Sequence, residues 1–504
     1  MKEGKIWTLL CVLILLVQTA VETLTAVIVL RLEILPDKYM LLLLAAMALM
    51  LLFNGLLLLA GKRNTAGKKV RRIIGCMIAL LVVFGCALLA RVASDAYRAM
   101  NTVTKPAVTT NARNVYVLVR DDDPAQNLKD TVEYTFGIIE DYDLEHTEQA
   151  IKEIGEVIGK DPSVTEYVGS VEIAEALYSK ELDAAIMNGV SIALLLEQEG
   201  YEDFTQKVRI VSTMSLSFLE ESVETTAPPE TLPPEDDVTN TPFIVYISGS
   251  DTRSAMLNVS RSDVNILMVV NPVTKQVLLI NTPRDYYVPN PAGNGRLDKL
   301  THCGIYGVEC SIGALEGLYD MKVDFYGQIN FTGLETLVDA VGGVTVYSEQ
   351  SFSAGTTYIS AGENTLNGAQ ALDFCRERYH VSGGDNGRGK NQMKVIKAVI
   401  QKMTTGTTVI SKYSSILESL EGMFKTSMSM EEIGKLVKMQ LSDMATWEVF
   451  TFAATGSGGS EKTYSAPGYY AYVMYPNKSV VSHTSGLIDR VLAGEILTQE
   501  DMTP

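Results

Sequence analysis

Residues 263–285 read DVNILMVVNPVTKQVLLINTPRD, and this stretch decides the fold of the larger folded region. Two runs rich in Val, Ile and Leu, 263–272 and 276–285, flank a Pro-Val-Thr-Lys turn. Apolar β-branched runs on either side of a short turn predict a β-hairpin. Because the centres of the two runs, 266–270 and 277–280, are apolar at every position, we expect strands that are buried on both faces.

Strands and helices alternate outward from this hairpin. Further strands are expected at 243–250, 325–331 and 344–348, and helices at 310–320, 332–343, 368–378 and 391–405. The pattern predicts an α/β/α domain with a central mixed sheet, because helices must cover both faces of such strands. We place this domain at 243–405, followed by a C-terminal extension at 406–504 that packs on it.

The chain of 504 residues is acidic overall and apolar on average. It has 42 Lys and Arg against 60 Asp and Glu, a formal net charge of -18 and a pI of about 4.8. This balance argues against nucleic-acid binding, which needs a basic face to displace counterions from phosphates. Six cysteines at this length exclude a disulfide-dense scaffold. The mean hydropathy of +0.13 indicates membrane segments.

Three apolar stretches in residues 1–92 carry this hydropathy. Residues 6–30, 39–61 and 73–92 are each long enough to cross a bilayer as a helix. The loop between the last two, 62–72, holds six basic residues and no acid, so the positive-inside rule places it in the cytoplasm. We therefore expect a multi-pass protein of the cell membrane with its folded domains outside the cell.

A proline-rich acidic segment at 221–242 divides the rest of the chain. It has five prolines and six acids but no basic residue, which predicts an extended, solvated linker. Before it, residues 112–220 alternate strand and helix patterns and predict a small α/β accessory domain. Three consecutive aspartates at 121–123 form either a cation site or a solvated turn before a proline.

Arginines and aspartates gather where the predicted elements of the larger domain end. They stand in 249–254, 261–263, 283–285, 376–378 and 385–388. One interpretation is ordinary ion pairs at the ends of elements. The other is a shared site, in which guanidinium groups bind a diphosphate and carboxylates hold Mg²⁺ or Mn²⁺. Because these clusters lack His and Cys, oxygen ligands are favoured over a zinc site.

A set of motifs in this domain resembles the LytR-CpsA-Psr family, membrane-anchored ligases of cell-wall glycopolymers in Gram-positive bacteria. The three spans and the accessory domain further resemble its capsule-associated, CpsA-like branch. The motifs are SGSDTR (248–253), RSDVNILMVVNP (261–272), INTPRDYYV (280–288), RLDKLTH (296–302), FTGLETLVDAVGGVTV (331–346), LNGAQALDFCRERY (366–379) and DNGRGKNQ (385–392).

The resemblance implies a site for a polyprenyl diphosphate-linked glycan, with the lipid in an apolar tunnel and the diphosphate at its mouth. It implies that Asp251 and Asp263 hold Mg²⁺ or Mn²⁺. In one departure, Asn391, Gln392 and Met393 stand where the family commonly has Arg-Gln-Gln. By motif position, the residues implied to bind the diphosphate are Arg253, Arg261, Arg284, Lys299, Arg376, Arg378, Asp385, Arg388 and Gln392.

The resemblance also implies a reaction, a Mg-dependent phosphoryl transfer of a glycopolymer to peptidoglycan. Arg284 is expected to stabilise charge, and Asp263 or Asp285 to accept the proton of the attacking hydroxyl. The polymer is a capsular polysaccharide or a teichoic-acid-like glycan, and capsule or wall-assembly proteins are possible partners. Alternatives are a hydrolase of the lipid diphosphate, a protein that only binds the lipid carrier, and a membrane-bound transcriptional regulator or attenuator.

Three remaining features have competing interpretations. Cys303 and Cys310 could form an external disulfide, but seven residues along a helix separate them too far, which favours free thiols. His302 is expected to serve packing. The tyrosine-rich run at 464–477 is either a platform on which sugars stack or an edge strand that covers the core.

Overall fold

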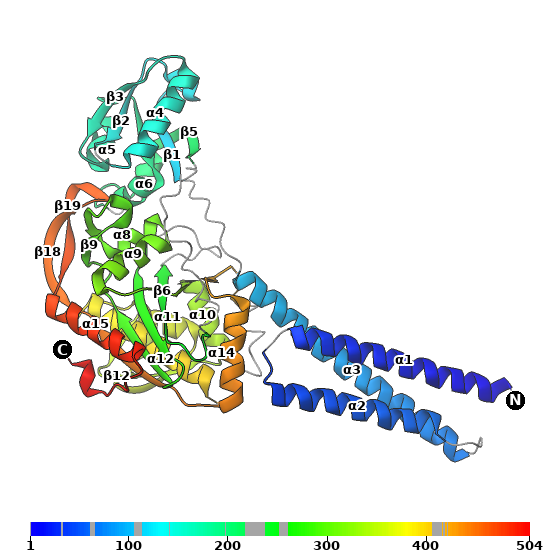
Figure 1. Cartoon of the computed structure of the whole chain (residues 1–504). Coiled ribbons are helices and arrows are strands. Elements are labelled where there is room, and N and C mark those ends of the chain that lie inside the picture. The colour runs from blue at the N-terminus through cyan, green and yellow to red at the C-terminus, as the bar shows by residue number, and fades with distance from the viewer. Residues whose placement is uncertain are drawn as a thin grey trace.

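A computed structural model of the chain shows a mixed α/β protein with three parts (Figure 1). A bundle of amino-terminal helices projects from one side of the larger domain, and the accessory domain lies against a different side, next to β19. The structure describes residues 2–31, 34–60, 66–104, 113–140, 142–196, 198–216, 237–250, 261–405, 416, 419–420 and 422–503.

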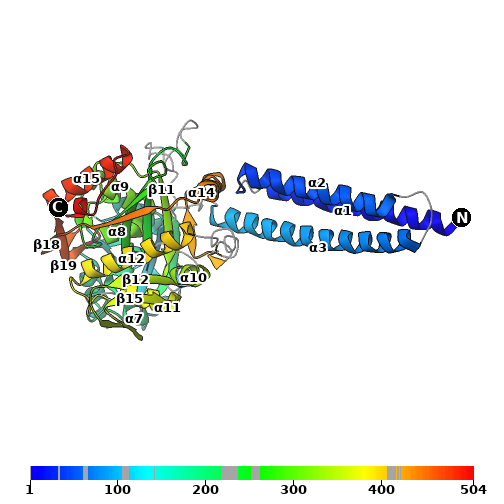
Figure 2. The ribbon, with the colours of Figure 1, turned by 90° about the horizontal axis from the view of Figure 1, so that it is seen from below.

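Three apolar helices form the membrane anchor. They are α1 (Lys2–Arg31), α2 (Asp37–Leu59) and α3 (Ala66–Val103), and each is long and apolar enough to cross a membrane. They run side by side in both views (Figures 1 and 2). Each predicted span therefore falls on a helix, although α3 continues past the predicted end at residue 92.

The turn between α1 and α2 contacts the larger domain at α14 (Met430–Asp443). Ile34 in this turn is buried together with Leu441. Lys438 forms an ion pair of 2.8 Å with Asp37, at the start of α2. The anchor is thus packed against the domain as well as joined to it by the chain.

The accessory domain is the small α/β unit that the sequence predicts. Its sheet has the order β3-β2-β4-β1-β5, in which β2 pairs in parallel with β3 and β4. Its strands are β1 (Arg113–Arg120), β2 (Thr135–Ile139), β3 (Ser163–Tyr167), β4 (Ala184–Asn188) and β5 (Val208–Leu216), and its helices α4 (Leu144–Ile158), α5 (Ser170–Tyr178), α6 (Gly189–Leu195) and α7 (Phe204–Lys207).

The aspartates at 121–123 belong to a turn of this domain. Asp122 pairs with Lys180 at 3.0 Å, and Asp123 accepts hydrogen bonds from Tyr134 Oη at 2.8 Å and the amide of Ala125 at 2.9 Å. These partners occupy the carboxylates, so the structure favours the turn over the cation site.

The larger domain is built on a six-stranded mixed sheet with the order β16-β11-β6-β7-β8-β17. The predicted hairpin is confirmed, because β7 and β8 pair antiparallel from Ile266 opposite Asn281 to Asn271 opposite Gln276. The strands are β6 (Phe243–Ser250), β7 (Val264–Asn271), β8 (Gln276–Asn281), β11 (Phe325–Asn330), β16 (Phe424–Thr426) and β17 (Glu448–Ala453).

Helices cover both faces of this sheet, which confirms the α/β/α prediction. Tyr246 and Leu267 face α9 (Val308–Tyr319) and α15 (Lys478–Leu492), while Val245 and Ile266 face the side of α12 (Asp385–Thr404) and α14. Successive residues of a strand point to opposite faces, so an uninterrupted apolar run fills two cores.

Two predicted domain boundaries differ from the structure. Strand β17, from the predicted extension at 406–504, pairs in parallel with β8 and completes the central sheet. The domain therefore does not end at 405. At the other end, Val238 of the predicted linker is buried in the same core as Phe243, so packed structure begins before residue 243. Tertiary contacts decide both boundaries, and local sequence patterns do not reveal such contacts.

The remaining elements flank the sheet. The predicted strand at 344–348 is β12 (Val344–Ser348), but it pairs with β15 (Gly362–Leu366) outside the central sheet. The others used below are β9 (Tyr287–Pro289), β10 (Leu297–Lys299), α8 (Leu300–Cys303), α10 (Phe331–Ala340), α11 (Gly368–Arg376), β18 (Gly456–Thr463) and β19 (Ala466–Pro476).

These elements bear on two of the open interpretations, and the sugar platform stays a prediction. The tyrosine-rich run is strand β19, whose Val473 is buried against the domain while Tyr470 and Tyr472 are exposed. Cys303 and Cys310 are free thiols, as expected, but they lie on two different helices, α8 and α9, so the premise of one helix is wrong.

Candidate functional site

The topology of the sheet brings residues from four of the five predicted charged clusters to one edge. Because β7 and β8 are antiparallel, Asp263 just before β7 lies beside Arg284 just after β8. The end of α11 and the start of α12 reach the same edge, with Arg376 and Arg388.

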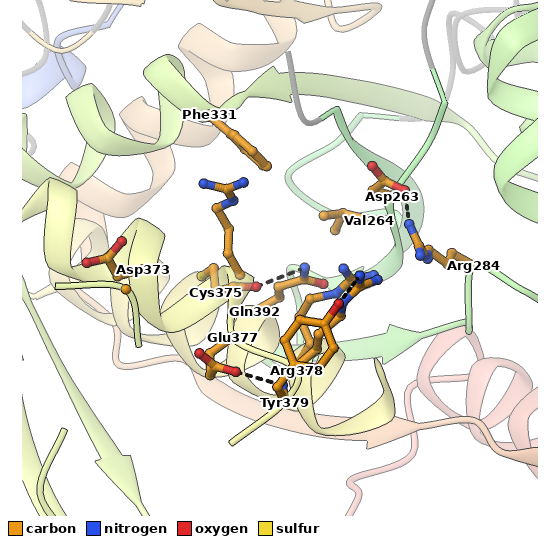
Figure 3. A pocket seen from close by; sticks show the side chains of 13 residues that line it. Asp263, Val264, Arg284, Phe331, Asp373, Cys375, Glu377, Arg378, Tyr379 and Gln392 are labelled. Carbon is orange, nitrogen blue, oxygen red and sulfur yellow. Dashed lines mark hydrogen bonds and ion pairs between the residues drawn. The ribbon is translucent and has the colours of Figure 1, made fainter. Parts of the chain in front are cut away.

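These side chains surround a cavity of about 370 Å³ (Figure 3). Four arginines from three separate segments line it, and all four are among the predicted diphosphate ligands. The picture shows Asp263 beside Arg284, with Phe331 and Arg378 across the opening. The lining comprises Asp263, Val264, Arg284, Phe331, Gly355, Asp373, Cys375, Arg376, Glu377, Arg378, Tyr379, Arg388 and Gln392.

Arg284 is held by three carboxylates. Its Nη1 donates to Asp263 Oδ1 at 2.6 Å, and its Nε lies 3.7 Å from Asp385 Oδ1 and 3.9 Å from Asp285 Oδ2. Burial disfavours the charge, but the carboxylates outweigh burial and raise the pKa of the Arg284 guanidinium. Arg284 is therefore a fixed cation whose geometry is set by its neighbours.

Arg388 lies in the first turn of α12, with its Nη2 2.5 Å from Asp385 Oδ1. Burial lowers the pKa of Arg388, an effect that Asp385 opposes. The helix predicted at 391–405 begins earlier in the structure, because α12 starts at Asp385, within the glycine-rich stretch. Gly389 makes this possible, because a Cβ there would stand 2.3 Å from Nδ2 of Asn281 at the end of β8.

Arg376 and Arg378 differ from the other two arginines. Within the described part of the chain, no carboxylate lies within 4 Å of either guanidinium. Arg376 lies over the ring of Phe331 at 4.6 Å, and Arg378 over that of Tyr379 at 4.7 Å while donating to its hydroxyl at 2.6 Å. Two cations that face a cavity without carboxylate partners suit an anionic ligand.

Other predicted residues lie behind the cavity wall. Lys299, the last residue of β10, pairs with Asp285, whose carboxylate is buried. Neither residue belongs to the described lining. Gln392 does line the cavity, and its amide donates to the carbonyl of Cys375 at 3.3 Å.

Asp385 pairs with Arg284 and Arg388 but does not belong to the described lining either. Three further predicted residues are not brought to the cavity by what the structure describes. Arg261 is described but does not line the cavity. Asp251 and Arg253 lie outside the described residues, so the predicted metal pair of Asp251 and Asp263 stays a prediction. The apolar lipid tunnel also stays a prediction, although Val264, Phe331 and Cys375 give the cavity an apolar part.

Sequence reasoning missed several residues of the site. Thr301 donates from its amide to the carbonyl of Arg284 at 2.8 Å, and its hydroxyl lies 3.4 Å from Asp263 Oδ1. Thr301 belongs to the RLDKLTH motif, and this could have indicated that it is part of the site. Phe331 and Tyr379, which carry the rings beneath Arg376 and Arg378, also belong to quoted motifs, but ring contacts of this kind leave no pattern in a sequence.

Comparison with known proteins places most of the larger domain in one family. The sequence profile described as the LytR_cpsA_psr family matches residues 212–482. This stretch contains all six strands of the central sheet and the whole cavity lining.

Curated relatives named polyisoprenyl-teichoic acid–peptidoglycan teichoic acid transferase TagU match a shorter part. The Enterococcus faecalis protein is 36% identical over 197 residues, which cover 39% of this chain and 64% of the relative. The Oceanobacillus iheyensis protein is 34% identical over 200 residues, 38% of this chain and 61% of the relative. The matches thus span less than two thirds of either relative. A solved structure named TagT bound to LIIa-WTA is 25% identical, covering 53% of this chain and 97% of that one, with a TM-score of 0.43.

Proposed function

Because the chain belongs to the LytR_cpsA_psr family, we propose that it transfers a glycopolymer from a polyprenyl diphosphate carrier to peptidoglycan. The observation that carries this proposal is the convergence of Arg284, Arg376, Arg378 and Arg388 on one cavity. The names of the TagU relatives, which are teichoic acid transferases, support the same reaction class.

The charges of the cavity suit a diphosphate. Arg284 and Arg388 are oriented by carboxylates, which fixes them in place before a ligand arrives. Arg376 and Arg378 supply positive charge that no described carboxylate neutralises. A planar guanidinium binds two phosphate oxygens at once, so this arrangement stabilises charge on the non-bridging and leaving oxygens.

The proposed step is a phosphoryl transfer. A sugar hydroxyl of peptidoglycan attacks the phosphorus next to the glycan, and a new oxygen–phosphorus bond forms. The bond from that phosphorus to the bridging oxygen breaks, and polyprenyl phosphate leaves with the electron pair. Asp263 lines the cavity whereas Asp285 is buried behind it, so we assign the proton of the attacking hydroxyl to the Asp263 carboxylate.

The donor set suits a hard cation such as Mg²⁺. This ion is commonly held by one or two carboxylates together with substrate phosphates, and Asp263 supplies one such carboxylate at the cavity. Asp251 would be the second predicted ligand. When bound, Mg²⁺ would neutralise charge on the diphosphate oxygens.

The three amino-terminal helices determine on which side of the membrane the proposed reaction takes place. We propose that the basic loop at 62–72 is cytoplasmic and that both folded domains are outside the cell, where peptidoglycan lies. Donor lipid and enzyme then share one bilayer surface, which raises their effective concentration. The polymer is a teichoic-acid-like glycan or a capsular polysaccharide.

The test uses the purified full-length protein in detergent, with a synthetic polyprenyl diphosphate-linked oligosaccharide and soluble peptidoglycan fragments. We expect release of polyprenyl phosphate together with a glycan–phosphate–peptidoglycan product, detected by mass spectrometry. Arg376→Ala should abolish product formation. Arg490→Ala, on the surface of α15 and remote from the cavity lining, is the matched control and should retain activity.

Each alternative gives a different result in this assay. A hydrolase releases polyprenyl phosphate at the same rate with and without the acceptor. A protein that only binds the carrier retains the lipid without turnover. A regulator or attenuator requires residues 243–405 inside the cell, which a reporter fused after residue 504 would reveal. Any of these outcomes contradicts the proposed transferase.

A further inference from the structure

The accessory domain lies next to the β19 end of the larger domain (Figure 1), and tyrosine rings form part of the contact between them. The ring of Tyr464, just before β19, lies 5.5 Å from that of Tyr142 in the accessory domain and 6.0 Å from that of Tyr306. Nearby, the backbones of Gly169 and Gly468 approach so closely that a Cβ on Gly169 would stand 2.6 Å from Gly468 Cα. The contact between the domains is thus closely packed.

A chain of hydrogen bonds crosses this interface. The hydroxyl of Tyr142 bonds that of Tyr306 at 3.1 Å, which bonds Ser465 Oγ at 2.8 Å. Ser465 Oγ in turn donates to Asp298 Oδ2 at 2.5 Å. Tyr142, Ser465 and Asp298 are all buried, so water does not compete for these bonds.

The series of hydrogen bonds ends at Asp298, which precedes Lys299 in β10. Its side chain is fully buried and also accepts hydrogen bonds from His302 Nδ1 at 2.6 Å, Asn290 Nδ2 at 3.0 Å and the amide of Lys299 at 2.8 Å. A buried carboxylate with this many donors fixes the backbone around it.

Lys299, the next residue of β10, links the position of this strand to the cavity. Successive side chains of a strand point to opposite faces, so in β10 Asp298 faces the buried network while Lys299 faces the other way. Lys299 contacts Asp285, which is 3.9 Å from Arg284 Nε. Arg284 lines the cavity. A shift of β10 would therefore move the ion pairs that orient Arg284.

We propose that Asp298 is a positioning residue of the site, and that the accessory domain holds it through Tyr142, Tyr306 and Ser465. The accessory domain then acts on the reaction through the placement of Lys299, without touching the substrate. Its effect on turnover rests on the function proposed above, whereas its effect on β10 does not.

The first test measures hydrogen exchange of the full-length protein in detergent. Tyr142→Phe removes one hydroxyl and keeps the ring. We expect exchange in the peptide covering 284–301 to rise about threefold or more. Tyr178→Phe is the matched control, because among the described residues its buried hydroxyl has no hydrogen-bond partner. Equal exchange in the two variants would overturn the proposal.

The second test is a double-mutant cycle on turnover with the donor and acceptor described above. Tyr142→Phe should lower kcat/KM about threefold or more in the wild-type chain but have little effect in a Lys299→Met background. The same loss in both backgrounds would show that Lys299 does not carry the effect. If the wild-type chain shows no turnover, the proposed function fails, while the exchange experiment still decides whether the accessory domain positions β10.

Discussion

At the scale of single residues, the cavity contains two kinds of arginine. Arg284 and Arg388 are paired with carboxylates, whereas Arg376 and Arg378 rest on aromatic rings. The first pair neutralises acids that are buried or half-buried, so it contributes to stability as well as to ligand binding. In the described structure the second pair neutralises no carboxylate, so its charge is available to an anionic ligand.

Replacing one member of each pair should separate these two roles. Arg284→Ala leaves Asp263, Asp285 and Asp385 without their shared cation, and we expect a loss of about 3 kcal/mol of unfolding free energy together with loss of activity. Arg376→Ala should change stability by less than about 0.5 kcal/mol and still abolish activity. Denaturant unfolding and the transfer assay measure both, and equal destabilisation by the two variants would contradict this division.

Asp298 gives a prediction about pH. Its burial alone would raise its pKa, but His302 and the other donors outweigh burial and lower the pKa of the carboxyl. A carboxyl whose pKa is lowered by folding stabilises the protein above its unfolded pKa of about 3.9, and this stabilisation is lost as the pH falls through the folded value.

We therefore expect Asp298→Asn to lower the thermal unfolding midpoint at pH 6 and to flatten its dependence on pH below about 4. Thermal scans of the full-length protein between pH 3 and pH 6, in about unit steps, measure this. A parallel downward shift of the whole curve, with an unchanged slope below pH 4, would assign Asp298 no part in the acid sensitivity.

At the scale of elements, the first two turns of α12 position Arg388 and Gln392, and their packing depends on Gly389. Gly389→Ala should force the turn away from Asn281, because the new Cβ would stand 2.3 Å from that side chain. We expect a loss of about 1–3 kcal/mol in stability and a marked loss of activity.

Gly434→Ala in α14 is the control for this substitution. A Cβ at Gly434 meets nothing within 4 Å, so alanine there should be neutral or stabilise the helix by about 0.5–1 kcal/mol. Denaturant unfolding of both variants tests the comparison. A neutral result at Gly389 would mean that α12 tolerates a shift at its start.

Local signals explain which elements the sequence predicts. The β7–β8 hairpin follows from two apolar runs around a turn, and the four cavity arginines stand in motifs at the ends of elements. The start of α12 was missed because DNGRG has poor helix propensity, which tertiary packing at Asn281 overrides. The pairing of β17 with β8 was missed because it joins segments that are distant in sequence, and no local pattern encodes such a partner.

At the scale of the whole molecule, the larger domain is built on one continuous sheet that includes strands beyond the predicted boundary at 405. A chain truncated after residue 405 would lack β16, β17, α14 and α15, which cover parts of both cores. We expect this truncated protein to be recovered as aggregate or proteolytic fragments, as judged by gel filtration in detergent and limited proteolysis. A monodisperse, protease-resistant product would restore the predicted boundary.

The parallel neighbours β8 and β17 also constrain the order in which the chain acquires its structure. Parallel pairing of segments this far apart closes a long loop, so the entropy of that loop must be lost before the pairing stabilises anything. The accessory domain, whose strands all lie within 113–216, can form while later residues are still being synthesised. The larger domain must wait for residue 453, and until then the apolar edge of β8 is open to aggregation. We therefore expect the nascent protein to need protection of that edge until β17 has been synthesised.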